Sequence, residues 1–142
     1  MRRIVIDTNC LLAILPSISP YHKVWTEFLE GRIEICVSNE ILMEYEEIIS
    51  QKTSSFFADI IIKALLNRRN LVRVSPTWRF RLISQDPDDN KFVDCAIAGQ
   101  AEILVSNDKH FRVLNAIDFP AVTLLRLQEF ILTLSHQGQE PL

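Results

Sequence analysis

The chain has 142 residues, of which 48% are hydrophobic and 23% are charged, the balance of a globular protein about one domain long. Its 15 basic and 18 acidic residues give a net charge of −3, which argues against a protein that coats nucleic acid by its overall charge. No apolar run is long enough to span a membrane, and Met1-Arg2-Arg3 leads into a strand-length run rather than a secretory signal. We therefore expect a cytoplasmic protein with no membrane association.

Apolar runs of strand length alternate along the chain with segments of helical spacing. In chain order, the expected elements are a strand at 4–6, a helix at 24–29, a strand at 33–37, helices at 41–49 and 57–65, a strand at 71–74, a helix at 92–97, strands at 103–105 and 121–125, and a helix at 127–134. Strand runs that are apolar throughout are typical of a parallel sheet covered on both faces. The pattern predicts one α/β domain over residues 1–135, a three-layer α/β/α fold with a parallel, roughly five-stranded central sheet, and a frayed tail at 136–142.

Three cysteines, Cys10, Cys36 and Cys95, form an odd set without the spacing of a metal-binding or redox pair. Each lies in an apolar run, where a thiol behaves as a small hydrophobic group. We expect all three to be buried and reduced.

Two acidic residues directly follow apolar strand runs. Asp7 comes after the run at 4–6, and Asp108 lies three residues after the run at 103–105. Because ligands of parallel α/β sheets gather outside the carboxyl ends of the strands, both acids are candidate site residues.

Two further acids reach the same edge from the starts of helices. Ser38 has the character of a helix cap, which places Glu44 in the second turn of the helix that follows. Pro87 fits the opening of another helix, with Asp89 in its first turn. All four acids are thus expected on one rim of the sheet.

Clustered carboxylates repel one another, so a fold that buries them needs a compensating cation. Ligation by oxygen alone suits Mg²⁺ or Mn²⁺ and disfavours Zn²⁺. Two divalent ions held in this way would hydrolyse a phosphodiester bond. Residues expected to orient the carboxylates or their water molecules are Thr8, Asn9, Ser106 and Asn107.

A single acid at a strand end or helix start is more often a turn or capping residue than a ligand. We interpret Glu40, Asp86 and Asp88 in this way. Four acids at four such positions are harder to explain by capping alone.

These residues carry a resemblance to a known family. The motifs are Val5-Ile6-Asp7-Thr8-Asn9, the segment 38–44 with an acid six residues after its serine, the segment 86–92, and the segment 101–108. Over about residues 3–125 the chain resembles the PIN-domain ribonucleases, especially the toxin components of bacterial toxin-antitoxin pairs (VapC-like). The resemblance implies a parallel sheet flanked by helices, dependence on Mg²⁺ or Mn²⁺, single-stranded RNA as substrate, and an antitoxin protein or a second copy of the chain as partner. It assigns the catalytic, metal-binding roles to Asp7, Glu44, Asp89 and Asp108.

One position departs from the family pattern. Many relatives carry their third acid where this chain has Asn90. Either the neighbouring Asp89 serves instead, or Asp94, one helical turn further on, takes part. We favour Asp89 and expect Asn90 and Asp94 close by.

Basic residues concentrate around the end of the helix at 57–65, where Lys63, Arg68 and Arg69 occur. They form either a solvated face or a surface that guides RNA phosphates into the site. His110, two residues after Asp108, is a further candidate for a phosphate contact.

Other enzyme classes on similar sheets fit less well. Phosphatases of the haloacid type need a second Asp where this chain has Asn9, and response-regulator receivers need an Asp where Ser75 follows the strand at 71–74. The remaining alternative is a non-catalytic PIN-like module that retains the acids and binds RNA or a protein.

Overall fold

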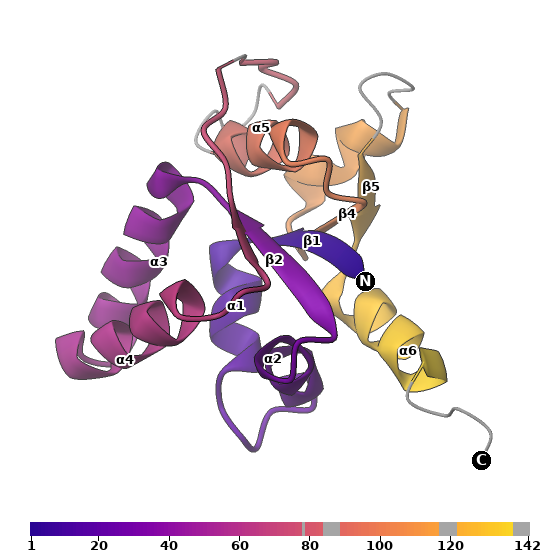
Figure 1. Cartoon of the computed structure of the whole chain (residues 1–142). Helices are drawn as coiled ribbons and strands as arrows, with labels where there is room; N and C mark the ends of the chain where they lie inside the picture. The colour runs from indigo at the N-terminus through magenta and orange to yellow at the C-terminus, as the bar shows by residue number, and fades with distance from the viewer. Residues whose placement is uncertain (78, 84–88, 117–121, 138–142) are drawn as a thin grey trace.

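A five-stranded parallel sheet forms the centre of the computed structural model, which describes residues 1–77, 79–83, 89–116 and 122–137 (Figure 1). The strand order is β3-β2-β1-β4-β5, and every neighbouring pair is parallel. The strands are β1 (Arg2–Ile6), β2 (Ile33–Val37), β3 (Leu71–Arg73), β4 (Ile103–Val105) and β5 (Thr123–Leu125). The predicted fold class is confirmed, and each strand overlaps an apolar run of the sequence.

Helices cover both faces of this sheet. They are α1 (Thr8–Ile14), α2 (His22–Leu29), α3 (Asn39–Lys52), α4 (Ser55–Leu66), α5 (Asn90–Ala98), the 3₁₀ helix η2 (Lys109–Ala116) and α6 (Leu127–Gln137). Figure 1 shows α5 on one side of the sheet and α1, α2 and α6 on the other, with α3 and α4 forming a hairpin beside them. The three layers expected from the alternating pattern are therefore present.

The sequence pattern missed α1 and η2 and ended the last helix too early. Asp7, taken from the sequence as a residue after a strand, is also the N-cap of α1. The spacing of η2 differs from the α-helical period that the sequence analysis sought. Helix α6 continues to Gln137, two residues beyond the expected domain end at 135; Asp86, Pro87, Asp88 and residues 138–142 lie outside the described part of the chain.

The middle of the sheet is apolar on both faces because helices cover each side. Ile4, Val5 and Ile6 of β1 are completely buried, and Ile4 aligns with Ile35 of β2 and with Ile103 of β4. The register of these buried residues brings the carboxyl ends of β1 and β4 side by side at one edge of the sheet.

The backbone ladder continues one residue past several of these ends. Asp7 N donates to Val105 O at 3.0 Å, and Ser106 N donates to Leu125 O at 3.0 Å. The polar residues that follow β1 and β4 are therefore held in register with the sheet itself.

The three cysteines are buried and free, as predicted. Sγ of Cys36 on β2 lies 3.8 Å from Sγ of Cys95 on α5, so this pair packs the helix against the sheet.

Among the described residues, no helix combines the length and the apolar character that crossing a membrane requires.

Candidate active site

The four predicted acids line one cleft of about 260 Å³ at the carboxyl ends of the strands. Asp7, Glu44, Asp89 and Asp108 come from four separate segments of the chain and meet there. Asn9 lines the same cleft, as expected for a residue that could hold a water molecule near the acids. The geometry thus agrees with a shared site.

Asp7 is the most enclosed of these acids, with 8% of its surface exposed. Its Oδ1 accepts a hydrogen bond from Cys10 N at 2.8 Å, and its Oδ2 accepts one from the Ser106 hydroxyl. Burial raises the pKa of the Asp7 carboxyl, the hydrogen bonds from Ser106 and Cys10 oppose that rise, and the nearby Asp108 adds to it. Among the described residues, no basic side chain balances Asp7, so a bound cation would offset its burial.

Glu44 is positioned by the residues around it on α3. Ser38 caps this helix by accepting from Ile41 N at 3.3 Å, and the neighbouring Tyr45 is fully buried and donates its hydroxyl to Ile6 O at the end of β1. The Glu44 carboxylate accepts from the Thr8 hydroxyl and lies 2.7 Å from Nζ of Lys91. Helix α3 is therefore tied to β1 beside the cleft.

Among the described residues, Asp89, Asp108 and His110 form a group of potential metal ligands. One ligand atom from each lies within 4.8 Å of the others. Asp89 is the N-cap of α5, and Asp108 is oriented by its own backbone N–H, which donates to Ser106 Oγ at 3.0 Å. Oδ1 of Asp108 accepts from His110 N at 2.9 Å and lies 3.4 Å from His110 Nδ1.

The donor set of this group is carboxylate with one imidazole. This differs from the oxygen-only set expected from the sequence, because η2 turns His110 back toward Asp108. Carboxylates still predominate, and carboxylate oxygen is the ligand that Mg²⁺ and Mn²⁺ prefer. Together with the buried Asp7, the residues present fit a divalent cation.

Of the residues expected to orient the acids, Thr8 and Ser106 contact them directly, through Glu44 and Asp7. Asn107 does not, because its Oδ1 accepts from Leu127 N at 3.0 Å at the start of α6. The Asn90 amide also bonds elsewhere: it accepts from Ile83 N and donates to Ile83 O, both at 2.9 Å. These two asparagines hold neighbouring segments in place.

Asp94 is buried on the side of α5 that faces the segment around residue 80. Its Oδ1 accepts from Phe80 N at 3.1 Å, and its Oδ2 lies 3.9 Å from Arg79. Burial raises the pKa of this carboxyl. Asp94 does not line the cleft, whereas Asp89 does, so the geometry favours Asp89 as the third acid.

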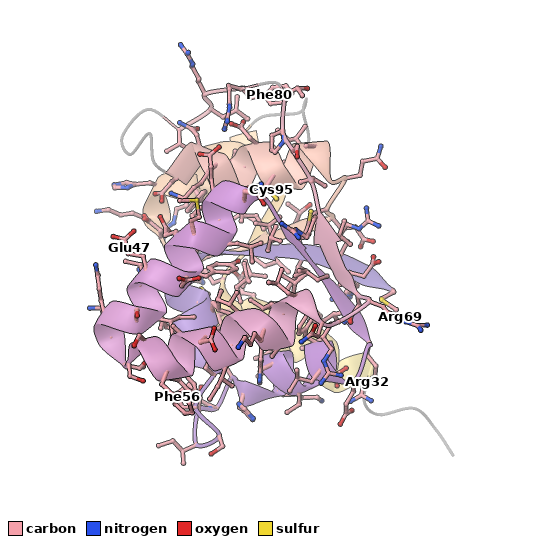
Figure 2. The ribbon with its side chains drawn as sticks, turned by 60° about the vertical axis from the view of Figure 1, so that its left-hand side comes forward. Arg32, Glu47, Phe56, Arg69, Phe80 and Cys95 are labelled. Atoms are coloured by element: carbon pink, nitrogen blue, oxygen red, sulfur yellow. The ribbon has the colours of Figure 1, made fainter. Side chains whose placement is uncertain are left out.

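The basic residues Lys63, Arg68 and Arg69, singled out in the sequence, are not among the residues that line the cleft, and their contact with RNA stays a prediction. Lys63 pairs with Asp59 at 2.9 Å, and Arg68 donates to Leu29 O at 3.0 Å. Arg68 and Arg69 precede β3 and so belong to the amino ends of the strands; Figure 2 shows Arg69 toward the same end of the molecule as Arg32. Of the RNA-binding candidates named from the sequence, His110 is the one that lies beside Asp89 and Asp108.

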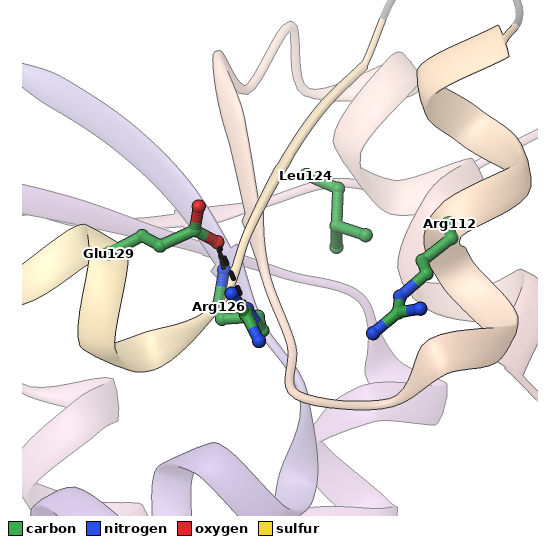
Figure 3. Close-up of a pocket in the computed structure, with 4 residues that line it drawn as sticks. All are labelled: Arg112, Leu124, Arg126 and Glu129. Atoms are coloured by element: carbon green, nitrogen blue, oxygen red, sulfur yellow. Dashed lines mark hydrogen bonds and ion pairs between the residues drawn. The ribbon is translucent and has the colours of Figure 1, made fainter.

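Other basic residues, which the sequence analysis missed, lie at the correct edge. Arg126 directly follows β5, the same signal that identified Asp7, and Arg112 belongs to η2 just after Asp108. The two arginines, Leu124 and Glu129 line a second hollow of about 270 Å³ (Figure 3). Arg126 lies 3.4 Å from Glu129, while Arg112 forms no ion pair with a described residue.

A family model described as "PIN domain" matches residues 3–110. The chain is similar in structure to VapBC2 from Rickettsia felis bound to a DNA fragment from their promoter (TM-score 0.59, 19% identity, covering 87% of this chain and 98% of that one). It is also similar to DNA-bound VapBC from Salmonella typhimurium (TM-score 0.57, 16% identity, covering 89% of this chain and 99% of that one). A third similar structure is that of the PIN domain endonuclease Utp24 (TM-score 0.51, 15% identity, covering 87% of this chain and 84% of that one). No curated protein matches the sequence. The family model spans most of the chain, and the protein therefore belongs to the PIN domain family.

Proposed function

We propose that this protein is a metal-dependent ribonuclease that hydrolyses phosphodiester bonds of single-stranded RNA. The observation that carries the proposal is the convergence of Asp7, Glu44, Asp89 and Asp108 on one cleft. Asp89, Asp108 and His110 are the residues that would hold Mg²⁺ or Mn²⁺. The chemistry that such an ion would supply when bound is the activation of water and the stabilisation of the leaving oxygen of a phosphodiester.

The chain's own residues have separate tasks in this proposal. Ser106 orients two acids at once, because its hydroxyl donates to Asp7 and its oxygen accepts from Asp108 N. Thr8 holds Glu44. The acids therefore keep their places before substrate arrives, as a preorganised site requires.

Arg112 and Arg126 support an anionic polymer as substrate. Leu127 N and Leu125 O, on either side of Arg126, bond to Asn107 and to Ser106 N, so this arginine lies close to the segment that leads to Asp108. Guanidinium groups bind phosphate oxygens well. We propose that the hollow in Figure 3 holds a phosphate of the RNA backbone next to the one that is cleaved.

We further propose that the protein is the toxin of a toxin-antitoxin pair. Support comes from the resemblance of its motifs to that branch and from the VapBC structures that share its fold. Helix α4 carries a surface that suits a protein partner, either an antitoxin or a second copy of this chain. Phe56 and Ile60, one turn apart, are 75% and 45% exposed (Phe56 is labelled in Figure 2).

The test is cleavage of a fluorescent, unstructured RNA by metal-stripped protein with Mn²⁺, with Mg²⁺ and with EDTA. We expect cleavage with either metal, none with EDTA, and none of single-stranded DNA of the same sequence. Asp108→Asn purified in parallel controls for contaminating nucleases. Cleavage that persists in EDTA would refute the metal-dependent mechanism, and no Mn²⁺-induced stabilisation together with RNA binding would favour a non-catalytic module.

A further inference from the structure

A lysine pairs with one of the acids that line the cleft. Nζ of Lys91 lies 2.7 Å from Glu44 Oε1, and only 13% of the lysine side chain is exposed. The same ammonium lies 5.2 Å from the ring centre of Phe92, a residue that lines the cleft. Lysine is rarely so enclosed unless it is paired, and its contacts with Glu44 and Phe92 hold Lys91 against the wall of the cleft.

Glu44 is consequently engaged through both of its oxygens. Oε1 faces Lys91, and Oε2 accepts from the Thr8 hydroxyl. Glu44 also stands outside the tight group of ligand atoms from Asp89, Asp108 and His110. Glu44 is thus the acid of the cleft whose charge is balanced by an ammonium group of the chain.

We infer that Lys91 is a resident cation that takes the place of a second divalent ion. The inference rests on the proposed metal-dependent function and changes one expectation of it: the cleft binds one divalent ion, on the side of Asp89, Asp108 and His110, instead of two. An ammonium in contact with Glu44 repels a dication from that carboxylate. Lys91 is a positioning residue here, because it acts through Glu44.

The number of bound ions tests this without any measurement of cleavage. Metal-stripped full-length protein is titrated with Mn²⁺, and free Mn²⁺ is followed by electron paramagnetic resonance. We expect one ion per chain for the native protein and for Lys91→Arg, which keeps the charge. Lys91→Met should bind a second ion, with affinity at least about tenfold above any second binding to the native chain.

Two further variants control for general charge and for the role of Glu44. Lys52 lines the same cleft at the end of α3 but is not paired with Glu44, so Lys52→Met removes the same charge and should still bind one ion. Glu44→Gln should also retain one ion at near-native affinity, whereas Asp108→Asn should lose it.

Unfolding in EDTA gives an independent measurement. Lys91→Met should melt lower than the native protein, because Glu44 then lies uncompensated among other acids, and Lys91→Met with Glu44→Gln should recover most of the loss. A native chain that binds two ions overturns the inference even if Lys91→Met does not fold, and leaves the metal-dependent function intact. No binding of Mn²⁺ to any variant overturns both.

Discussion

The two edges of the sheet use charged residues differently. At the amino ends of the strands, Arg32 lies 2.6 Å from Glu27, and Arg3 lies 3.2 Å from Glu34. Asn70 donates to the carbonyl oxygen of Ile33 at 2.6 Å. At the carboxyl ends, four acids share one cleft. Lys91 pairs with one of these acids, Glu44.

This difference separates structural charge from functional charge. Charged side chains that form ion pairs within the chain need no bound ligand to balance their charge. A surplus of one sign, partly buried, costs free energy that a ligand of opposite charge can offset. The excess of negative charge, rather than the number of charged residues, distinguishes the candidate site.

The largest expected effect comes from removing charge at the carboxyl edge. Asp7→Asn and Asp108→Asn should each lower the rate of RNA cleavage by orders of magnitude, because each removes a charge proposed to bind or balance the metal. Glu30→Gln at the amino edge, where Glu30 pairs with Arg32 on the surface, should leave the rate unchanged. Equal losses at both edges, measured at saturating Mn²⁺, would contradict the comparison.

Asp88 and Asp89 give a sharper version of this test. We expect Asp89→Asn to be far more damaging than Asp88→Asn, since Asp89 lines the cleft. If the two variants lost the same activity, the choice of third acid would be wrong.

A smaller effect should separate the arginines of the two edges. Arg112→Ala with Arg126→Ala should raise the KM for RNA several-fold with little change in kcat, because these side chains are proposed to hold a phosphate away from the cleaved bond. Arg68→Ala with Arg69→Ala, at the amino edge, removes the same charge and should leave KM unchanged. The assay is initial rate against RNA concentration at fixed salt. A larger rise in KM for the Arg68 and Arg69 variant would indicate that RNA binds around Arg68 instead.

The fold, and the meeting of the four acids at one edge of the sheet, were predictable from sequence because strand periodicity and helix-start signals fix where these residues lie. Buried parallel strands are apolar throughout, and residues after strand ends meet at one edge. The same rule would have found Arg126, which follows β5, and would have rejected Arg68, which precedes β3.

The direction of individual side chains was beyond such a rule. Asn107 lies next to Asp108 in sequence, yet it bonds to the start of α6. Asp94 lies on the same helix that Asp89 caps, yet the rotation of α5 turns Asp94 toward Arg79. His110 reaches Asp108 through a 3₁₀ turn that α-helical spacing does not predict.

A modest effect on stability should follow from Tyr45→Phe. The change removes a buried hydrogen bond to Ile6 O that ties α3 to the end of β1, at a cost of about 1–3 kcal/mol. Unfolding in urea measures the loss. Tyr21→Phe is the control, because the Tyr21 hydroxyl forms no hydrogen bond with a described residue and should contribute little to stability. A Tyr45→Phe protein as stable as the native one would mean that this hydrogen bond does not hold α3, and with it Glu44, in place.

The smallest expected effect tests the surplus charge itself. Because burial raises the pKa of Asp7 above its unfolded value, the folded protein holds this proton more tightly than the unfolded chain does. The ionised carboxylate therefore lowers stability at neutral pH, and this penalty disappears as the pH falls through the raised pKa toward the ordinary value near 4. In EDTA at pH 7, Asp7→Asn should melt at the same temperature as the native protein or a few degrees higher, with the difference shrinking in acid.

Mn²⁺ should reverse that ranking, because only the native chain gains the full stabilisation from a bound ion. Asp94→Asn is the matched control: burial also raises the pKa of Asp94, which lies away from the cleft, so this variant should follow the same trend with pH but show no reversal with Mn²⁺. An Asp7 that served only to cap α1 would behave differently, losing about 1 kcal/mol on substitution whether or not metal is present. Melting curves of the three proteins in EDTA and in Mn²⁺, at neutral and acidic pH, distinguish a carboxylate that binds a cation from one whose role is confined to capping a helix.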